Sequence, residues 1–291
     1  MRRLPFDPSL NVAISGANAA VHYARHWLTQ VGLHTTDSSE AAPVHIFAGG
    51  PTEQAATPPT ASEQVRIVLW DFNFETPGTG LQASAASGVA WVLGRPGQAP
   101  LALPIHLPEQ WCGLIGANLA LAYLLRADNH GAAEAPRVEV AAADALRAIA
   151  EQNAGSESEV LARWHRNGSI AVEHGGIFPQ GYFRCGDGHV AIIGRSRKDW
   201  RAIQEVIGNP DWAQQAGFED PFKLALDGAE ASKLLEGSLL EFSRDELLAR
   251  SSVNGATIAP VYRIDELASR DVVRSDFFGD DGRAQLPFDI R

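Results

Sequence analysis

The stretch "GGIFPQGYFRCGDGHVAIIG", residues 175–194, has the pattern of two short strands joined by a tight turn. Tyr182 and Arg184 alternate with Phe183 and Cys185, which is the period of a strand with one buried face. After the Gly-Asp-Gly turn, the apolar side resumes with Val190, Ile192 and Ile193. The stretch therefore predicts a β-hairpin.

The residues before the hairpin alternate between strand-like and helix-like segments. The segments "LNVAIS" (10–15) and "VRIVLWDF" (65–72) have the apolar pattern of buried strands, and a Pro/Thr/Ala-rich link after "VHIFAGG" (44–50) leads to the second of them. After the first strand comes a helical pattern that ends at Gly32, a residue type that commonly closes helices. Alternation of strand and helix predicts a parallel sheet.

A long helix is predicted to start at Pro108, because proline lacks only an N–H that a first helical turn leaves unpaired. A strand over 137–142 and a helix over 143–153 continue the α/β pattern. The polar segment 154–169 then has the composition of a hinge. We expect the apolar stripe of the long helix to consist of Leu114, Ala117, Leu121 and Leu124.

The fold class that these segments predict is α/β. A Rossmann-like parallel-sheet domain is expected over residues 1–168, hinge included, followed by a smaller α+β domain over residues 169–291. The second domain begins with the hairpin and continues mainly as helices. Ser243 and Glu246 have the spacing of a capping box at the start of one of them.

Composition excludes several classes of function. The 291 residues are 45% hydrophobic, which is enough for a normal globular core. A net charge of −11 argues against a nucleic-acid or acidic-membrane partner, and no segment is apolar enough to predict a membrane helix. The only cysteines, Cys112 and Cys185, are too few for a disulfide framework, so we expect a cytoplasmic protein.

General catalytic motifs are largely missing from the sequence. The strand at 10–15 is followed by neither a Gly-x-Gly-x-x-Gly nor a P-loop pattern, and no serine has nucleophile-elbow flanks. His22 and His26 have the i,i+4 spacing of helical metal ligands, but no carboxylate motif accompanies them. No metal site and no permanently bound cofactor is therefore predicted.

The second half of the chain resembles the small domain of the family III CoA-transferases, the CaiB/BaiF-like group of formyl-CoA and carnitine CoA-transferases and α-methylacyl-CoA racemases. In the first half, "RVEVAAADALRAI" and "SGVAWVLGRPGQAP" are similar to segments of the same family. The chain resembles a shortened and divergent member. The small-domain resemblance rests on Tyr182, Asp187-Gly188, Trp200, Gly208, Ala259-Pro260-Val261, Glu266 and Phe277-Phe278.

The resemblance implies that a carboxylate attacks an acyl-CoA thioester and is regenerated after CoA passes to an acceptor acid. The family carries this carboxylate as an aspartate four residues before a glycine at a helix start, and the matching residue here is Glu109 in "EQWCG". A glutamate reaches about one methylene further, and a displacement of about 1 Å can cost ~100-fold in rate. Glu109 could equally be a helix-opening residue whose charge complements the helix dipole.

Other expectations also follow from the resemblance. Gly175 and Gly176 fall where the family carries a glycine-rich loop over the active site, although turn glycines of a plain hairpin explain them equally well. Arg95 is a candidate contact for a CoA phosphate. The racemase branch is disfavoured, because its Gly-His-Asp signature is absent from "TPGTGLQASAASG".

Two functions remain open from the sequence. One is a CoA-transferase that uses coenzyme A or acyl-CoA and a carboxylic acid as substrates. The other is a catalytically inactive subunit that keeps the fold and pairs with a complete paralogue. Family members form interlocked dimers, so either function implies a homodimer or a heteromer with a paralogous subunit.

Overall fold

The computed structural model describes residues 10–38, 42–50, 63–104, 106–125, 136–149, 165–166, 168–170, 176–270, 274, 277–280, 282 and 284. They form two compact units, each described by itself below. The short loop 94–99 belongs to the second unit, and the few described residues from Arg274 onward belong to the first. Most of the predicted hinge lies outside the described residues, and the predicted domain boundary at residue 168 stays a prediction.

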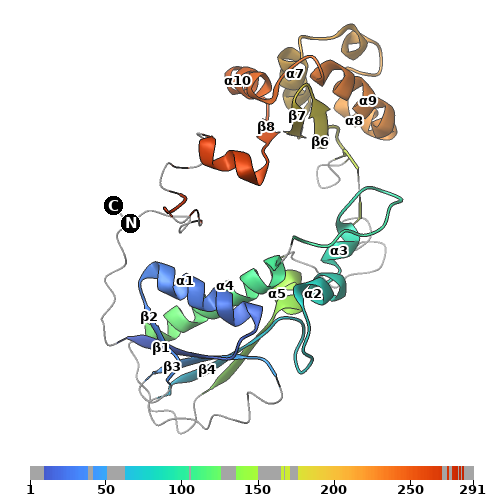
Figure 1. Cartoon of the computed structure of the whole chain (residues 1–291). Helices are drawn as coiled ribbons and strands as arrows, with labels where there is room; N and C mark the ends of the chain where they lie inside the picture. Colours follow the sequence, from blue (N-terminus) through green and yellow to red (C-terminus); the bar gives the residue numbers. More distant parts are fainter. Residues whose placement is uncertain are drawn as a thin grey trace. The chain divides into compact units, whose positions relative to one another are not determined.

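The first unit is built on a five-stranded parallel sheet with the strand order β2-β1-β3-β4-β5 (Figure 1). This is one of the two common orders of doubly wound α/β folds, and the order reverses between β1 and β3. The predicted α/β class with a parallel sheet is confirmed. The strands are β1 Asn11–Ser15, β2 His34–Thr36, β3 Val44–Ala48, β4 Val65–Trp70 and β5 Arg137–Ala141.

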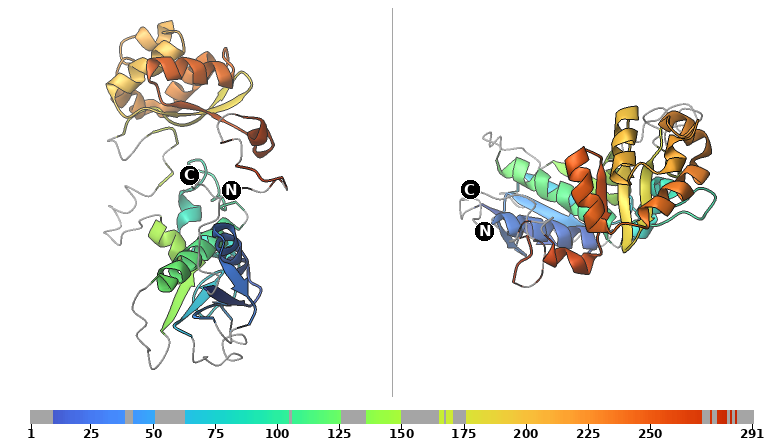
Figure 2. Two further views of the ribbon diagram at one scale, coloured as in Figure 1. Left: turned by 90° about the vertical axis from the view of Figure 1, so that its left-hand side faces the viewer. Right: turned by 90° about the horizontal axis from the view of Figure 1, so that it is seen from above.

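Helices α1 and α4 lie side by side over one face of this sheet (Figure 2). The Asn18 side chain caps α1 by accepting the N–H of Val21, and Gly32 closes the helix with a left-handed φ of 97°. The predicted helix end at Gly32 therefore has its structural cause. The helices of this unit are α1 Ala19–Val31, α2 Gly80–Ala86, α3 Val89–Val92, α4 Leu107–Leu124 and α5 Ala142–Ile149.

Of the predicted apolar stripe of α4, Ala117 is buried and Leu121 and Leu124 pack against the core, but Leu114 does not. Leu114 was expected in the core but is 38% exposed, and small residues form the buried face instead. Gly113 shows why: a Cβ atom there would lie 2.5 Å from the carbonyl oxygen of Ala20 in α1. The two helices pack backbone against backbone, which only a small residue permits. The buried residues of α4 are Pro108, Glu109, Cys112, Gly113, Gly116, Ala117 and Ala120.

The second unit contains a three-stranded antiparallel sheet with the order β6-β7-β8. The predicted hairpin is β6 Gln180–Cys185 and β7 Gly188–Ile193, and β8 is Ile258–Val261. Phe183, Val190 and Ile192 are buried as expected, whereas Ile193 is 38% exposed. Around the sheet lie α7 Arg197–Val206, α8 Pro221–Leu224, α9 Gly228–Leu239 and α10 Arg244–Asn254, with short 3-10 helices at Asp211–Gln214, Ala225–Asp227 and Ile264–Ser269 (η4).

A cluster of aromatic side chains lies in the core of the second unit. The fully buried Trp200 ring lies 5.9 Å from Phe178 and 6.1 Å from Trp212, measured between ring centroids. Its indole N–H donates to the carbonyl oxygen of Phe218 at 2.9 Å, so the one polar atom of the ring is satisfied. The predicted capping box at Ser243 is confirmed at the start of α10.

Candidate active site

Glu109 occupies the first turn of α4 at the carboxyl edge of the parallel sheet. Its side chain is only 3% exposed, although glutamate is among the residue types least often buried. One carboxylate oxygen, Oε1, accepts the backbone N–H of Gly80 at 2.6 Å. Because Gly80 begins α2, this bond ties the starts of two helices together, and both helix dipoles favour the negative charge.

The second oxygen of Glu109 is buried without a hydrogen-bond partner. It lies directly over Gly80, where a Cβ atom would be 2.1 Å from Oε2. Position 80 must therefore be glycine for the carboxylate to occupy this place. A buried carboxylate oxygen without a donor is costly, and such groups gather at functional sites.

A second carboxylate, Asp71, lies directly after β4. Its two oxygens accept the N–H groups of Ala19 at 2.9 Å and Ala20 at 2.8 Å, the first residues of α1. Burial raises the pKa of Asp71, and the negative charge of Glu109 adds to the rise, whereas the two amides and His106 oppose it. Asp71 and Glu109 are therefore electrostatically coupled carboxylates.

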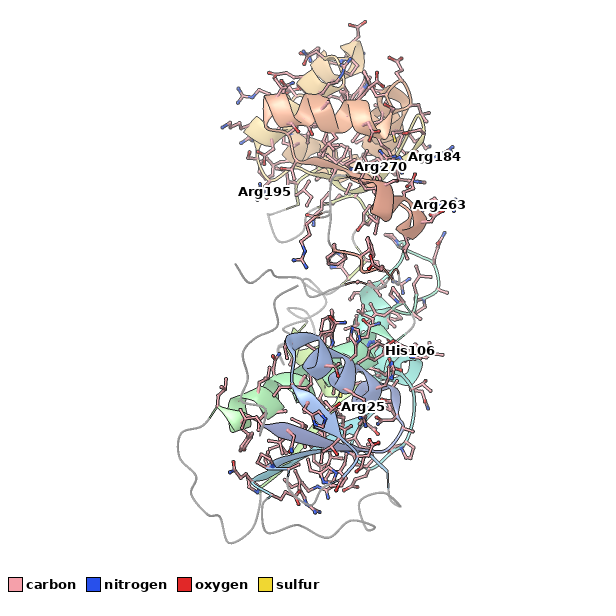
Figure 3. All side chains as sticks on the ribbon, turned by 60° about the vertical axis from the view of Figure 1, so that its left-hand side comes forward. Arg25, His106, Arg184, Arg195, Arg263 and Arg270 are labelled. Atoms are coloured by element: carbon pink, nitrogen blue, oxygen red, sulfur yellow. The ribbon has the colours of Figure 1, made fainter. Side chains whose placement is uncertain are left out.

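His106 precedes α4 and is the basic side chain next to these two carboxylates. Its Nδ1 lies 3.6 Å from Glu109 Oε1, and about half of its side chain is exposed (Figure 3). The ring centroid is 6.3 Å from that of Tyr23 in α1. The backbone of His106 has a φ of 63°, in the left-handed region that few non-glycine residues adopt.

Cys112, one turn after Glu109, is not available as a nucleophile. Burial raises the pKa of its thiol, and the charge of Asp71 raises it further. The thiol donates weakly to the carbonyl oxygens of Val140 at 3.4 Å and Trp70 at 3.6 Å. It stays protonated at neutral pH and packs the start of α4 onto the ends of β4 and β5.

The start of α2, the start of α4 and, through Asp71, the start of α1 thus meet at the carboxyl edge of the sheet. Doubly wound folds bind ligands at this edge. Helix N-termini there favour negative charge, whether it belongs to a side chain or to a bound anion. The arrangement therefore places the buried Glu109 carboxylate beside the half-exposed imidazole of His106, a group that can accept or donate a proton.

The remaining predicted site residues lie elsewhere. Arg95 is exposed in the loop that belongs to the second unit, and its backbone carbonyl accepts a hydrogen bond from Arg166 at 3.3 Å. Gly176 has a left-handed φ of 76°, with open space where a Cβ would stand. Gly175 lies outside the described residues. Roles for Glu109, Arg95 and both glycines remain predictions.

Sequence reasoning missed Asp71, Gly80 and His106. Asp71 could have been found, because it directly follows a buried strand at the edge where parallel sheets bind ligands. Gly80 stands in "TPGTG", which has the composition of a loop and no further signal. His106 is two residues before the helix-starting proline, and its left-handed backbone cannot be read from the sequence.

Other kinds of site were considered within the described part of the chain. There, no group of three or more His, Cys, Asp or Glu side chains is placed to hold a metal ion. None of the helices in the described residues is long and apolar enough to cross a membrane.

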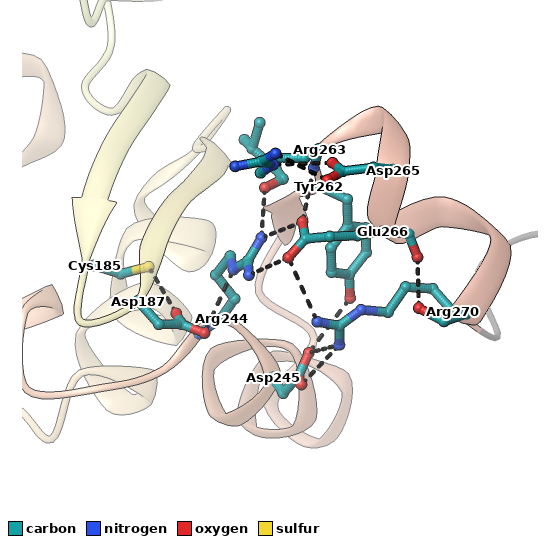
Figure 4. A network of polar contacts seen from close by, with 11 residues as sticks. Cys185, Asp187, Arg244, Asp245, Tyr262, Arg263, Asp265, Glu266 and Arg270 are labelled. Carbon is teal, nitrogen blue, oxygen red and sulfur yellow. Dashed lines mark hydrogen bonds and ion pairs between the residues drawn. The ribbon is translucent and has the colours of Figure 1, made fainter.

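A second polar cluster lies in the second unit and is centred on Arg244 (Figure 4). The guanidinium donates to both oxygens of Glu266 at 2.9 Å and to the carbonyl oxygen of Val261 at 3.0 Å, and it pairs with Asp187 at 3.5 Å. Arg244 hydrogen bonds lower the pKa of Glu266 to about 2. The cluster joins the hairpin turn, β8 and η4, and its groups are already paired with one another.

The fold of the chain has counterparts among known proteins. The model of CoA-transferase family III matches residues 73–280 of the chain, which is most of its length. The chain belongs to this family.

Individual relatives are more distant. The probable fatty acyl-CoA transferase Rv3272 of Mycobacterium tuberculosis is 25% identical over 191 residues, which cover 62% of this chain and 47% of that protein. The chain thus matches about half the length of this curated relative.

Solved structures share the fold. A crystal structure of Rv3272 from M. tuberculosis superposes with a TM-score of 0.69 at 17% identity, covering 100% of this chain and 94% of that one. A CAIB/BAIF family protein from Brucella suis gives a TM-score of 0.69 at 15% identity, covering 93% of this chain and 87% of that one. At these identities the likeness shows the fold alone.

Proposed function

We propose that the chain is a CoA-transferase that moves CoA between an acyl-CoA and a carboxylic acid, with Glu109 as the reacting carboxylate. The single observation that carries the proposal is the buried Glu109 carboxylate at the start of α4, with one oxygen held by Gly80 and the other unpartnered. Membership of CoA-transferase family III supplies the substrate class. A fatty acyl-CoA is a reasonable donor by analogy with the relative's name.

The proposed reaction needs no cofactor. A Glu109 oxygen attacks the thioester carbonyl carbon, the C–S bond breaks, and CoA leaves as the thiolate while a mixed anhydride forms. The thiolate attacks the Glu109 carbonyl of that anhydride, so the first acid leaves as a carboxylate and an enzyme thioester remains. The acceptor carboxylate attacks this thioester, and the released thiolate then takes the new acyl group and regenerates Glu109.

The Gly80 N–H and the burial of Glu109 would assist two steps of the proposed reaction. The Gly80 N–H holds Oε1, so it also stands near the position where negative charge develops when the Glu109 carbonyl is attacked. The covered position of the carboxylate keeps water away from an anhydride, which water would otherwise hydrolyse. Because the side chain is 3% exposed, attack on an acyl-CoA requires the carboxylate to turn toward the incoming thioester.

Arg95 and the glycines complete the proposal. The exposed guanidinium of Arg95 is a suitable partner for a CoA phosphate, which arginine binds well. Gly176, with its positive φ and open surroundings, suits a loop that lets a ligand approach the backbone closely. Gly175 is assigned to the same loop. The assembly we propose is a homodimer or a heteromer with a paralogous subunit.

The alternative is a catalytically inactive subunit that pairs with a complete paralogue, and one observation favours it. The Glu109 carboxylate is fitted into the fold against Gly80 and links α2 to α4. A structural carboxylate at a helix start would look the same. In that case the family aspartate has been replaced by a residue whose extra methylene serves packing.

Trapping of the acyl enzyme decides between the two functions. Incubation with an acyl-CoA followed by hydroxylamine converts an anhydride or thioester of Glu109 into a hydroxamate, which mass spectrometry locates on the peptide containing "LPEQWCG". We expect Glu109→Gln to abolish the adduct and to lower turnover by about a thousandfold or more, as loss of a nucleophile does. Its melting temperature is expected to stay close to that of the wild type, because a glutamine oxygen can still accept the Gly80 N–H.

Two further variants make the test specific. Glu241→Gln changes an exposed glutamate in the second unit and is expected to leave adduct and turnover unchanged. Glu109→Asp shortens the side chain to the family residue, and we expect it to retain the adduct at a changed rate. Turnover by Glu109→Gln at the wild-type rate would show that Glu109 only opens the helix. A wild type without adduct or turnover favours the inactive subunit.

A further inference from the structure

His106 has an unusual place at the start of the helix that carries Glu109. It is the residue before α4 begins, where Ser, Thr, Asn or Asp normally accepts a backbone N–H with its side chain. The His106 side chain makes no such bond, and its backbone nevertheless adopts the left-handed φ of 63°. An unfavourable backbone without a capping benefit indicates that the imidazole has another role.

The groups that face His106 come from three parts of the first unit. Glu109 in α4 lies 3.6 Å from Nδ1, Asp71 after β4 responds to its charge, and the Tyr23 ring in α1 is 6.3 Å away. Cys112 in α4 faces the same carboxylates, but burial keeps its thiol protonated. Among the described groups to which Asp71 responds, only a protonated His106 supplies positive side-chain charge.

We propose that His106 is a positioning residue for the Glu109 carboxylate, acting through its positive charge. The inference rests on the proposed role of Glu109 and adds a residue that sets when that carboxylate is ionised and where it is held. Two carboxylates in one poorly hydrated place oppose each other's ionisation, and a nearby cation relieves this opposition. With His106 protonated, both Asp71 and Glu109 can be charged together.

This assignment gives a definite pH dependence. A carboxylate attacks a thioester only when it is ionised, so adduct formation falls as the pH drops and Glu109 takes up a proton. Histidine is the side-chain type that ordinarily carries a positive charge in mildly acidic solution. His106 therefore keeps Glu109 reactive to lower pH than it would be alone.

The test compares His106→Asn with His106→Arg. Asparagine tolerates the left-handed backbone and is a good helix cap, so the fold is expected to persist without the charge. Arginine restores a permanent positive charge. The rate of formation of the hydroxylamine-trapped adduct at about pH 8 is the reference to which each variant's rate at lower pH is compared.

In mildly acidic buffer the variants are expected to separate. The Asn variant is expected to lose about two- to fivefold in the rate of adduct formation, the factor that a partly exposed ion pair supports, and the Arg variant to recover it. His189→Gln, an exposed histidine in β7 of the second unit, is the matched control and is expected to follow the wild-type profile. An Asn variant whose pH profile coincides with the wild type overturns the proposal.

A readout without turnover separates this inference from the proposed function. Diethyl pyrocarbonate reacts with the neutral imidazole, so the partnership with Glu109 protects His106 near pH 6.5. We expect His106 to react about two- to fivefold faster in Glu109→Gln, as judged by mass spectrometry of its peptide. Equal rates would refute the pairing even if the acyl adduct forms, whereas a faster rate without any adduct would support the pairing and refute the proposed function.

Discussion

Two buried or partly buried glutamates, one in each unit, are held in opposite ways. Glu266 in the second unit accepts three hydrogen bonds of 2.8–2.9 Å, two from the Arg244 guanidinium and one from the backbone N–H of Arg263. Glu109 in the first unit accepts one bond from Gly80 and leaves its other oxygen buried without a donor. Glu109 is therefore the more buried of the two carboxylates, although it accepts fewer hydrogen bonds than Glu266.

The difference separates a stabilising network from a candidate reactive group. Arg244 and the other donors favour the ionised form of Glu266, so protein stability is gained and the carboxylate has little capacity left for a ligand. Glu109 has a second carboxylate, Asp71, as a neighbour and lies 3.6 Å from the half-exposed His106, so few donors compete with a ligand for its free oxygen. Sequences usually satisfy their buried polar groups, and exceptions concentrate where function requires them.

The largest effect on stability is expected from Arg244→Met. The methionine keeps much of the apolar stem that packs beside Tyr262 but removes the hydrogen bonds to Glu266, Asp187 and the Val261 carbonyl. Loss of hydrogen bonds to charged partners predicts a decrease of about 1.5–3 kcal/mol in the free energy of unfolding. Denaturant titration measures it, and the trapped Glu109 adduct is expected to persist.

A matched ion pair nearby serves as the control. Arg263 and Asp265 approach to 2.8 Å, but both side chains are largely exposed. Asp265→Asn is therefore expected to change the melting temperature by less than about one degree. If both variants lose the same stability, pairing in the Arg244 cluster contributes no more than a surface contact, and the contrast with Glu109 fails.

Gly80→Ala is expected to have a smaller effect, whose sign depends on Glu109. Gly80 has a backbone conformation open to any residue, but an added Cβ would meet Oε2 of Glu109 at 2.1 Å. In the wild type this overpacking predicts a loss of about 1–3 kcal/mol, and adduct formation is expected to change because the carboxylate must move.

In a Glu109→Ala background the same Gly80→Ala change is expected to stabilise the protein by up to about 1 kcal/mol, because alanine is the better helix former and the space is free. A double-mutant cycle measured by denaturant unfolding shows whether the sign reverses. Equal losses in both backgrounds would mean that Gly80 is required for something other than the Glu109 carboxylate.

Much of the architecture could be predicted, because its signals are local in the sequence. The strands β1 and β4 are mainly apolar segments, and α1 ends at a glycine whose left-handed φ only its residue type suits well. Short or small-residue elements gave no such signal. The strand β2 has three residues and an exposed, polar start, and α2 is rich in Ala, Ser and Gly without an apolar period.

The candidate site could be predicted only as a single residue. The sequence indicates Glu109 because it stands four residues before Gly113. Its burial, however, depends on Gly80, which is 29 positions away in the chain. The same holds for Asp71, whose partners Ala19 and Ala20 lie about fifty positions earlier. Contacts between residues so far apart in the sequence form only in the folded chain, and no local sequence pattern predicts them.

The Arg244 contribution to stability is also expected to depend on pH. The pKa of Glu266 is lowered to about 2 in the folded chain, whereas an unfolded glutamate titrates near 4.3. Folding thus favours the ionised form, so this contribution is complete above about pH 4.3 and is lost as the pH falls toward about 2. Asp71 has the opposite sign: its raised pKa penalises the folded chain at neutral pH, and the penalty disappears as the pH falls through that raised value.

Stability curves of the wild type and Arg244→Met, measured by denaturant unfolding at several pH values, separate the two regions. We expect the difference between the curves to be constant at neutral pH and to shrink as the pH falls from about 4.3 toward about 2. Half of the folded Glu266 carboxylates are protonated when the pH reaches their pKa, whereas the bond to the Val261 carbonyl remains. Solvent screening reduces this pH-dependent difference in stability, because a quarter of the Glu266 side chain is exposed. The penalty at Asp71 is common to both proteins and cancels in the difference. Parallel curves down to the lowest pH would show that Arg244 stabilises the second unit through packing and its bond to the Val261 carbonyl. The electrostatic difference between Glu266 and Glu109 would then be smaller than their hydrogen bonds suggest.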